Sequence, residues 1–106
     1  MSDTVKTALD AYIKFISSLE GVLQIYLFGS YAKGVQNERS DIDLMVIIED
    51  NIDRTRTAIN ISKGLANRAI PLDVLVNRKT DFDGAACEPT IQRQITNEGV
   101  LLYAKQ

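Results

Sequence analysis

The chain reads VLQIYLFGSYAKG over residues 22–34 and SDIDLMVII over residues 40–48. Each stretch contains a run of aliphatic, β-branched and aromatic residues about as long as a strand. We therefore expect strands over Val22–Phe28 and Ile42–Ile48. The second run is apolar on both faces except at Asp43, which predicts a strand covered on both sides, or covered on one side with a site on the other.

Helix and strand patterns alternate over the rest of the chain. Apolar residues at steps of three and four predict a helix over Thr4–Leu19, capped by Asp3 or Thr4 and ended by Gly21. Next we expect a helix over Asp53–Ala69 broken by Pro71, a strand over Leu72–Val76 and a turn or short helix over Lys79–Ala86. A last helix is opened by Glu88-Pro89, with the proline in its first position, and closed by Gly99, and an edge strand follows over Val100–Tyr103. This order predicts an α+β fold over residues 1–106, a single domain with a mixed sheet of about four strands and helices packed mainly on one face.

Composition limits the class of protein. The 106 residues are 45% hydrophobic and 25% charged, which is typical of one globular domain. The 12 basic and 14 acidic residues give a net charge of −2, which argues against an extended nucleic-acid surface but not against a local phosphate site. The chain has no histidine, and this excludes Ser-His-Asp and Cys-His catalysis and histidine-ligated metal sites.

The sequence also bears on the compartment in which the protein works. Cys87 is the single cysteine and can form no internal disulfide, which favours an intracellular protein. The chain does not open with a basic segment followed by an apolar core, and its longest apolar run, Leu44–Ile48, is too short to span a bilayer. We therefore expect a cytoplasmic protein with no membrane partner.

Three acidic residues fall at or near the expected strand starts. Side chains alternate along a strand, so Asp41 and Asp43 are expected on one side, roughly 6.5–7 Å apart at about 3.3 Å per residue. Asp73 comes early in a third strand and would complete a cluster of three carboxylates if that strand lies beside the second. Such a set suits Mg²⁺ or Mn²⁺, because unneutralised carboxylates raise one another's pKa and the cation keeps positions open for substrate phosphates.

The Gly29-Ser30 pair is typical of a phosphate site. A strand that ends in Gly-Ser and turns into a short helix presents backbone N–H groups, a hydroxyl and the positive end of a helix dipole. Lys33 and Arg39 flank this path and are candidates for contacts with a triphosphate, the alternative being that they are solvated surface charges. With the carboxylates, the pair predicts phosphoryl or nucleotidyl transfer with two metal ions.

Other sites of similar spacing fail at individual positions. A Walker A loop beginning at Gly29 would need Lys and Ser or Thr where Val35 and Gln36 stand, and the chain has no Gly-x-Gly-x-x-Gly for a Rossmann site. An EF-hand loop fails because Met45 occupies its third ligand position. Alternatives remain open for single features: ordinary turn chemistry for the Gly-Ser pair, a capped strand start or a loop calcium site for Asp41-Ile42-Asp43, and a turn residue for Asp73.

The segments FGSYAKG over Phe28–Gly34 and SDIDL over Ser40–Leu44, with the later Asp73, resemble the nucleotidyltransferases of the DNA polymerase beta superfamily. Within that superfamily they look like the small free-standing group called minimal nucleotidyltransferases, and the resemblance extends to the EGVLLY ending over Glu98–Tyr103. It implies the nucleotidyltransferase fold.

The resemblance also implies roles for individual residues. Asp41 and Asp43 would bind two Mg²⁺ ions, with Mn²⁺ as the alternative, and Asp73 would bind the catalytic ion and act as base or orient the acceptor hydroxyl. Gly29 and Ser30 would hold the β- and γ-phosphates of ATP or another nucleoside triphosphate.

Members of the group are often encoded beside a helical partner of the HEPN type, a ribonuclease toxin. The resemblance therefore implies an antitoxin that transfers NMP, with AMP from ATP the first expectation, to a hydroxyl on that partner. The alternative is a non-catalytic module that neutralises a helical partner by forming a direct complex. The sequence leaves both homo- and hetero-oligomers open.

Overall fold

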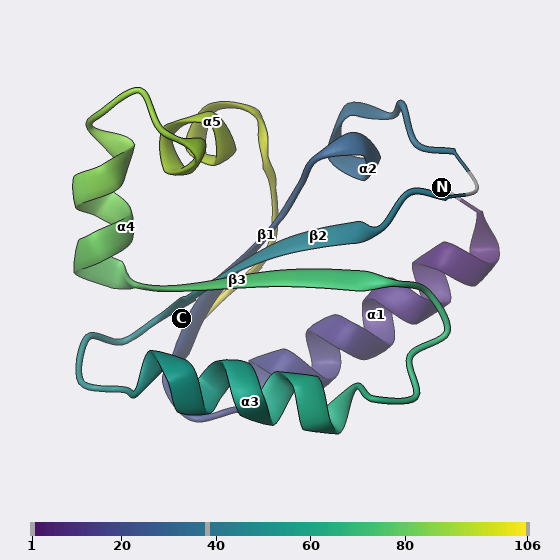
Figure 1. Ribbon diagram of the computed structural model, residues 1–106, viewed down its shortest axis with the longest axis horizontal. Helices are drawn as coiled ribbons and strands as arrows, with labels where there is room; N and C mark the ends of the chain where they lie inside the picture. The colour runs from purple at the N-terminus through teal and green to yellow at the C-terminus, as the bar shows by residue number, and fades with distance from the viewer. Residues whose placement is uncertain (1, 38, 106) are drawn as a thin grey trace.

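The computed structural model describes residues 2–37 and 39–105 and contains one four-stranded sheet with helices on both faces (Figure 1). The elements in chain order are α1 (Asp3–Ser17), β1 (Val22–Phe28), α2 (Ser30–Lys33), β2 (Ile42–Ile48), α3 (Arg54–Gly64), β3 (Leu72–Arg78), α4 (Lys79–Ala86), α5 (Ile91–Glu98) and β4 (Val100–Ala104).

The sheet is mixed, with the strands in the order β3-β2-β1-β4. β1 pairs antiparallel with β2 and with β4, whereas β2 and β3 are parallel. The two most apolar strands therefore lie in the centre and β4 lies at an edge, as the sequence predicts. This arrangement confirms the predicted α+β class and the mixed four-stranded sheet.

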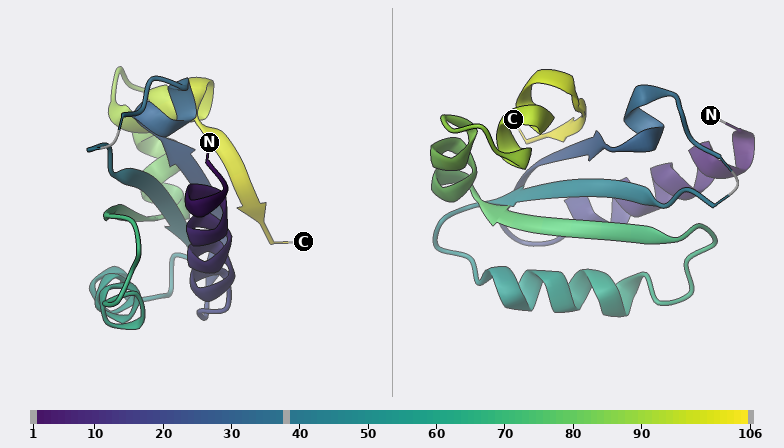
Figure 2. Two further views of the ribbon diagram at one scale, coloured as in Figure 1. Left: turned by 90° about the vertical axis from the view of Figure 1, so that its right-hand side faces the viewer. Right: turned by 45° about the horizontal axis from the view of Figure 1, so that its top comes forward.

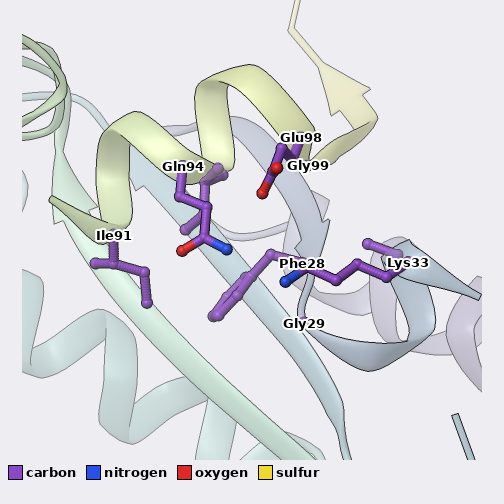
Figure 3. Close-up of a pocket in the computed structure, with 9 residues that line it drawn as sticks. Phe28, Gly29, Lys33, Ile91, Gln94, Glu98 and Gly99 are labelled. Carbon is purple, nitrogen blue, oxygen red and sulfur yellow. The ribbon is translucent and has the colours of Figure 1, made fainter. Parts of the chain in front are cut away.

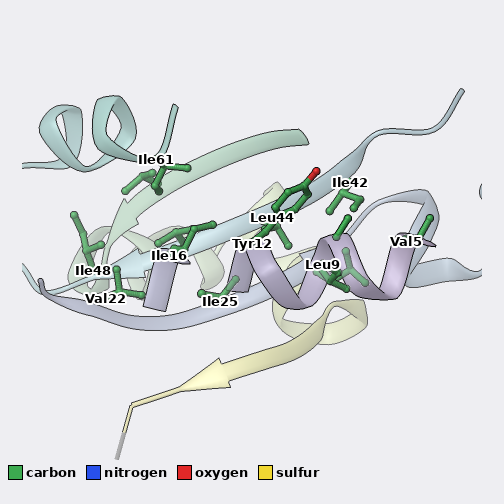
Figure 4. Packing of buried hydrophobic residues seen from close by; sticks show 14 residues of the cluster. Val5, Leu9, Tyr12, Ile16, Val22, Ile25, Ile42, Leu44, Ile48 and Ile61 are labelled. Carbon is green, nitrogen blue, oxygen red and sulfur yellow. The ribbon is translucent and has the colours of Figure 1, made fainter. Parts of the chain in front are cut away.

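The larger hydrophobic core lies between the sheet and the helices α1 and α3. The even-numbered residues of β2, from Ile42 to Ile48, contribute to it and are fully buried. Figure 4 shows Leu9 and Ile16 of α1 in the same core. Because α1 carries apolar residues at helical spacing, one side of it is buried along its length while the other stays in solvent.

A smaller core lies on the opposite face of the sheet, beneath α4 and α5. Met45 and Ile47 of β2 are fully buried there against Phe82 and Ile95. Figure 2 shows α3 on one side of the sheet and α5 on the other. Helices therefore cover both faces, the longer α1 and α3 one and the shorter α4 and α5 the other, rather than mainly one face as predicted. The second pair explains why β2 is apolar on both sides.

Several predicted ends move by a few residues. The hydroxyl of Ser2, rather than Asp3 or Thr4, caps α1 by accepting from the Val5 N–H. The helix predicted to start at Pro89 begins after it, because the Thr90 hydroxyl accepts the Arg93 N–H and is the N-cap.

Two other elements have different ends from those predicted. α3 ends at Gly64 rather than at residue 69. Gly64 lies directly against the ring of Phe15, which leaves no room for a side chain at this position. β3 runs two residues beyond Val76, because Asn77 and Arg78 continue its pairing with β2. No helix in the described part of the chain combines the length and the apolar character needed to cross a membrane.

Tyr12 ties α1 to the loop before β3. Its side chain is 3% exposed, and its hydroxyl donates to the Ile70 carbonyl at 2.7 Å and accepts from the Ile70 N–H at 3.0 Å. We expect Tyr12→Phe to lower the free energy of unfolding by about 1–3 kcal/mol, because two backbone groups lose their partner. Urea denaturation measures this, with Tyr103→Phe as the control for loss of a tyrosine hydroxyl; equal stability of the two variants would contradict it.

Candidate active site

Three strands bring one residue each into a single row on the face that carries α4 and α5. Asp43 of β2 is paired with Phe28 of β1 on one side and with Asp73 of β3 on the other. Residues in direct register point to the same side of a sheet, so the two carboxylates are neighbours although 30 residues separate them in sequence. The row lies where β1 ends and where β2 and β3 begin.

Gly29 follows Phe28 in the chain and lies against the Asp43 carboxylate. Its φ of 75° and ψ of −153° belong to a region that is essentially restricted to glycine. A Cβ at this position would also overlap the Oδ2 atom of Asp43. The glycine is therefore required twice, once by the backbone conformation and once by the closeness of the carboxylate.

The chain turns directly from Gly29 into α2, a single helical turn. Gly34 ends it in the left-handed conformation, with a φ of 72°. Ser30 is the first residue of this turn and is half-buried. The first N–H groups of a helix have no partner within it, so this corner presents donors beside the Asp43 carboxylate.

Asp43 is the electrostatic centre of the site. Burial raises the pKa of its carboxyl above the ordinary value of 3.8, and the negative charges of Asp73 and Asp41 raise it further. The neighbouring acids therefore act on Asp43 although neither forms a hydrogen bond to it within the described residues. A positive charge placed among them would reverse this effect.

The described side chains do not by themselves bring the three carboxylates together around one metal position, whereas the sequence predicts one cluster with positions left open for substrate phosphates. Among residues 2–37 and 39–105, no three Asp, Glu, Cys or His side chains are grouped closely enough to hold a metal ion as they stand. Asp41 precedes β2 rather than lying in it, so strand alternation does not place its side chain beside that of Asp43. Asp73 is exposed on an edge strand, and mutual repulsion favours separation of the like charges.

The donors nevertheless fit Mg²⁺ in kind. All three are hard carboxylate oxygens, as this ion prefers, and the raised pKa of Asp43 is a cost that a divalent cation would relieve. The chain has no histidine and its only cysteine, Cys87, is exposed on α4's C-terminal side, so no softer ligand competes for the site.

Of the two cations predicted beside the phosphate path, the structure brings one to the site. Lys33 lines a pocket of about 170 Å³ that opens next to Gly29, between α2 and α5. Arg39 is exposed in the segment between α2 and β2 and is not among the residues that line this pocket.

Sequence reasoning missed Gln94 and Glu98, which form the α5 side of the same pocket (Figure 3). A signal for them was present, because residues four apart share a face of a helix and Ile91 and Ile95 of the same helix also line the pocket. That signal reports only a common helix face. It could not show that this face meets Gly29, which lies about 65 residues earlier.

Residues 11–106 match the family model described as "Polymerase beta, Nucleotidyltransferase". The match includes the whole sheet, the Gly29-Ser30 corner and the three acidic residues. It leaves out only the first turns of α1.

Three similar proteins bear related names. "Putative protein adenylyltransferase MJ1379" of Methanocaldococcus jannaschii is 45% identical over 47 residues, which are 44% of this chain and 47% of that protein. MJ0604 of the same organism, with the same description, is 27% identical over 99 residues, or 85% of this chain and 92% of that protein. Protein adenylyltransferase MntA of Shewanella oneidensis is 55% identical over 29 residues, 27% of this chain and 21% of MntA. The matched part is thus less than half the length of MJ1379 and of MntA.

Solved structures share the fold over nearly the whole chain. A crystal structure of a toxin-antitoxin with AMP-PNP has a TM-score of 0.57 at 23% identity, covering 95% of this chain and 74% of that one. A crystal structure of the toxin-antitoxin MntA-HepT has a TM-score of 0.54 at 20% identity, with 95% and 74% covered. At these identities the likeness concerns the fold alone.

The contact between Gly29 and Asp43 predicts a difference between two glycine substitutions. Gly34 shares a positive φ but has no atom within 4 Å of an added Cβ. Gly34→Ala should therefore cost about 1 kcal/mol of stability from backbone strain alone. Gly29→Ala should cost about 1–3 kcal/mol more, because its backbone conformation is less accessible to alanine than that of Gly34 and its methyl group also displaces the Asp43 carboxylate. Urea denaturation of both variants measures the difference, and equal losses would show that Asp43 moves aside freely.

The raised pKa of Asp43 predicts how stability depends on pH. The folded state binds this proton more tightly than the unfolded chain does, so the contribution to stability is present below pH 3.8 and is lost as the pH rises through the folded-state pKa. We expect Asp43→Asn to be at least as stable as the parent at pH 7. We also expect this variant to lose the part of the pH dependence of stability that comes from protonation of Asp43. Denaturation at a series of pH values checks it, with Asp10→Asn on exposed α1 surface as the control; a destabilised Asn variant at pH 7 would contradict it.

Proposed function

Because this chain belongs to the polymerase beta nucleotidyltransferase family, we propose that it transfers NMP, in the first place AMP from ATP, to a hydroxyl of a partner protein. The observation that carries the proposal is the row that sets Asp43 between the Gly29 corner and Asp73. A transfer reaction needs one group that binds the phosphates of the donor and another that meets the acceptor. The turn at Gly29 lies on one side of Asp43 and the exposed Asp73 carboxylate on the other.

The acidic residues are assigned to the metal. Asp41, Asp43 and Asp73 would hold Mg²⁺, with Mn²⁺ as a substitute, after small movements of their side chains. When bound, two such ions supply charge neutralisation for the transferred phosphoryl group and activation of the attacking oxygen. The raised pKa of Asp43 supports this assignment, because it marks a partly buried carboxylate that is also repelled by its acidic neighbours.

The phosphates of the nucleotide are assigned to the side of Asp43 on which Gly29 and α2 lie. Gly29 lets the triphosphate approach the backbone, while the Ser30 hydroxyl and the first N–H groups of α2 donate hydrogen bonds to the β- and γ-phosphates. Lys33, from the same turn, lines the pocket beside Gly29 and would contribute a positive charge. These residues hold the part of ATP that leaves as pyrophosphate.

Asp73 is assigned to the acceptor. A bond forms between the acceptor oxygen and the α-phosphorus, and the bond between that phosphorus and the bridging oxygen of pyrophosphate breaks. Asp73 orients the attacking hydroxyl or takes its proton. The Asp73 side chain is exposed on the edge strand β3, so a group carried by a large partner can reach it from solvent.

The partner is proposed to be a helical HEPN-type toxin, with this chain as its cytoplasmic antitoxin. Support comes from the relatives, since MntA is named a protein adenylyltransferase and a structure of like fold is that of the toxin-antitoxin MntA-HepT. The toxin-antitoxin structure with AMP-PNP, which also shares the fold, supports an adenine nucleotide as the donor.

We expect incubation of a HEPN-type partner with this protein, ATP and Mg²⁺ to add the mass of one or more AMP units to the partner. Intact-protein mass spectrometry measures this. The double variant Asp41→Asn, Asp43→Asn should add none, and Asp81→Asn, on the exposed surface of α4, should act like the parent.

The same samples separate catalysis from simple binding. If the double variant still neutralises the partner and the parent adds no mass with any nucleoside triphosphate and either metal, the chain is a binding module. Mg²⁺ with ATP should also raise the unfolding temperature of the parent by several degrees, because the ligand binds only the folded site.

A further inference from the structure

The pocket between α2 and α5, here called the α2–α5 pocket, has walls of mixed chemistry. Phe28, Ile91 and Ile95 supply an apolar surface, and Gly29 forms the edge nearest Asp43. Ile91 is 43% exposed, so part of this apolar wall faces solvent. The lining also includes Ala32 and Gly99, which leave room rather than fill it.

Three polar side chains enter the pocket from its two sides. Figure 3 shows Lys33 reaching from α2 toward Phe28, with Gln94 and Glu98 on the α5 side. The one ion pair within residues 2–37 and 39–105 joins Lys79 to Asp83, so Lys33 and Glu98 are not bonded to each other. Both therefore keep hydrogen-bonding capacity for a ligand between them.

Apart from Lys33, whose charge can meet a phosphate at the Gly29 end, these walls do not suit a bare phosphate chain. The Glu98 carboxylate repels any anion that fills the pocket, and an apolar floor gives phosphate oxygens no partners. They suit a flat ring that is attached to an anionic group at the Gly29 end and carries hydrogen-bond donors at its far edge. The ring would cover Phe28 and Ile91, and its donors would meet Glu98.

The size of the pocket agrees with one ring system. Pockets for drug-sized ligands are roughly 300–1,000 Å³, whereas this one is about 170 Å³. It can therefore take the base of a nucleotide while the sugar and phosphates lie outside it, toward Gly29 and Asp43. A glutamine amide also matches the donor and acceptor at the edge of adenine.

We propose that the α2–α5 pocket binds the base of the nucleoside triphosphate and that Glu98 and Gln94 select a base with an exocyclic amino group. The proposal rests on the proposed function, since it takes the donor nucleotide to lie along Gly29. Glu98 accepts a hydrogen bond from the amino group and repels a keto oxygen at the same place. Gln94 adds a second, directional contact.

The test compares ATP with inosine triphosphate, which carries a keto oxygen where adenine carries its amino group. In the presence of Mg²⁺, titration calorimetry should show that the parent binds ATP at least about tenfold more tightly, the effect of one hydrogen bond to a charged group. Glu98→Gln should bring the two affinities to within about threefold, because an amide can donate to the keto oxygen. Glu88→Gln removes the same charge from an exposed residue outside the pocket and should keep the parent ratio.

Inorganic tripolyphosphate with Mg²⁺ serves as the probe for the phosphate and metal site alone, and its binding should not change in Glu98→Gln. An unchanged ratio of ATP to inosine triphosphate in that variant overturns the base-selection proposal and leaves the proposed function standing. Absence of binding of every triphosphate by the folded parent overturns both. A change of tripolyphosphate binding in either direction in Glu98→Gln would instead place Glu98 at the phosphates or their metal and also overturn the proposal.

Discussion

The contact between the Asp43 carboxylate and the backbone of Gly29 is the constraint on which the site depends. It brings an acidic group against the turn where donors for an anion begin, and it leaves space for no other residue than glycine. The contact exists because β1 ends beside the start of β2, with Phe28 and Asp43 in direct register. A slip of this register by one residue would turn Asp43 into the large core and remove the site.

The two faces of the sheet serve different purposes. On one face, Leu44 and Val46 of β2 pack under α1 and α3 in the larger of the two hydrophobic cores. That core allows the other face to carry groups that cost stability, above all a half-buried carboxylate with two acidic neighbours. Active sites commonly hold such unfavourable charges on a rigid framework, because the favourable interaction is made with the ligand rather than within the protein.

The site is open on the side of β3 and enclosed on the side of α5. Asp73 lies on an edge strand, whereas Gly29 and Lys33 face the pocket beneath Gln94 and Glu98. This asymmetry fits the proposed reaction between a small donor and a large acceptor, since a donor in the pocket would be surrounded and an acceptor would reach Asp73 from solvent. The fold that holds this arrangement is shared with structures of 20% and 23% identity.

Local patterns in the sequence determined the strands and the chemistry of the site. β1 and β2 have the bounds that their apolar runs predict. The Gly-Ser pair follows β1, and the acidic residues lie before or near the starts of β2 and β3, because such residues interrupt apolar runs. Only the tertiary structure decided the partners across the sheet, the position of Asp41 before β2 rather than in it, and the place of Gln94 and Glu98 opposite Gly29. The physical reason is range: propensity and periodicity act over a few neighbouring residues, whereas pairing of β3 with β2 and packing of α5 beside α2 depend on contacts between distant parts of the chain.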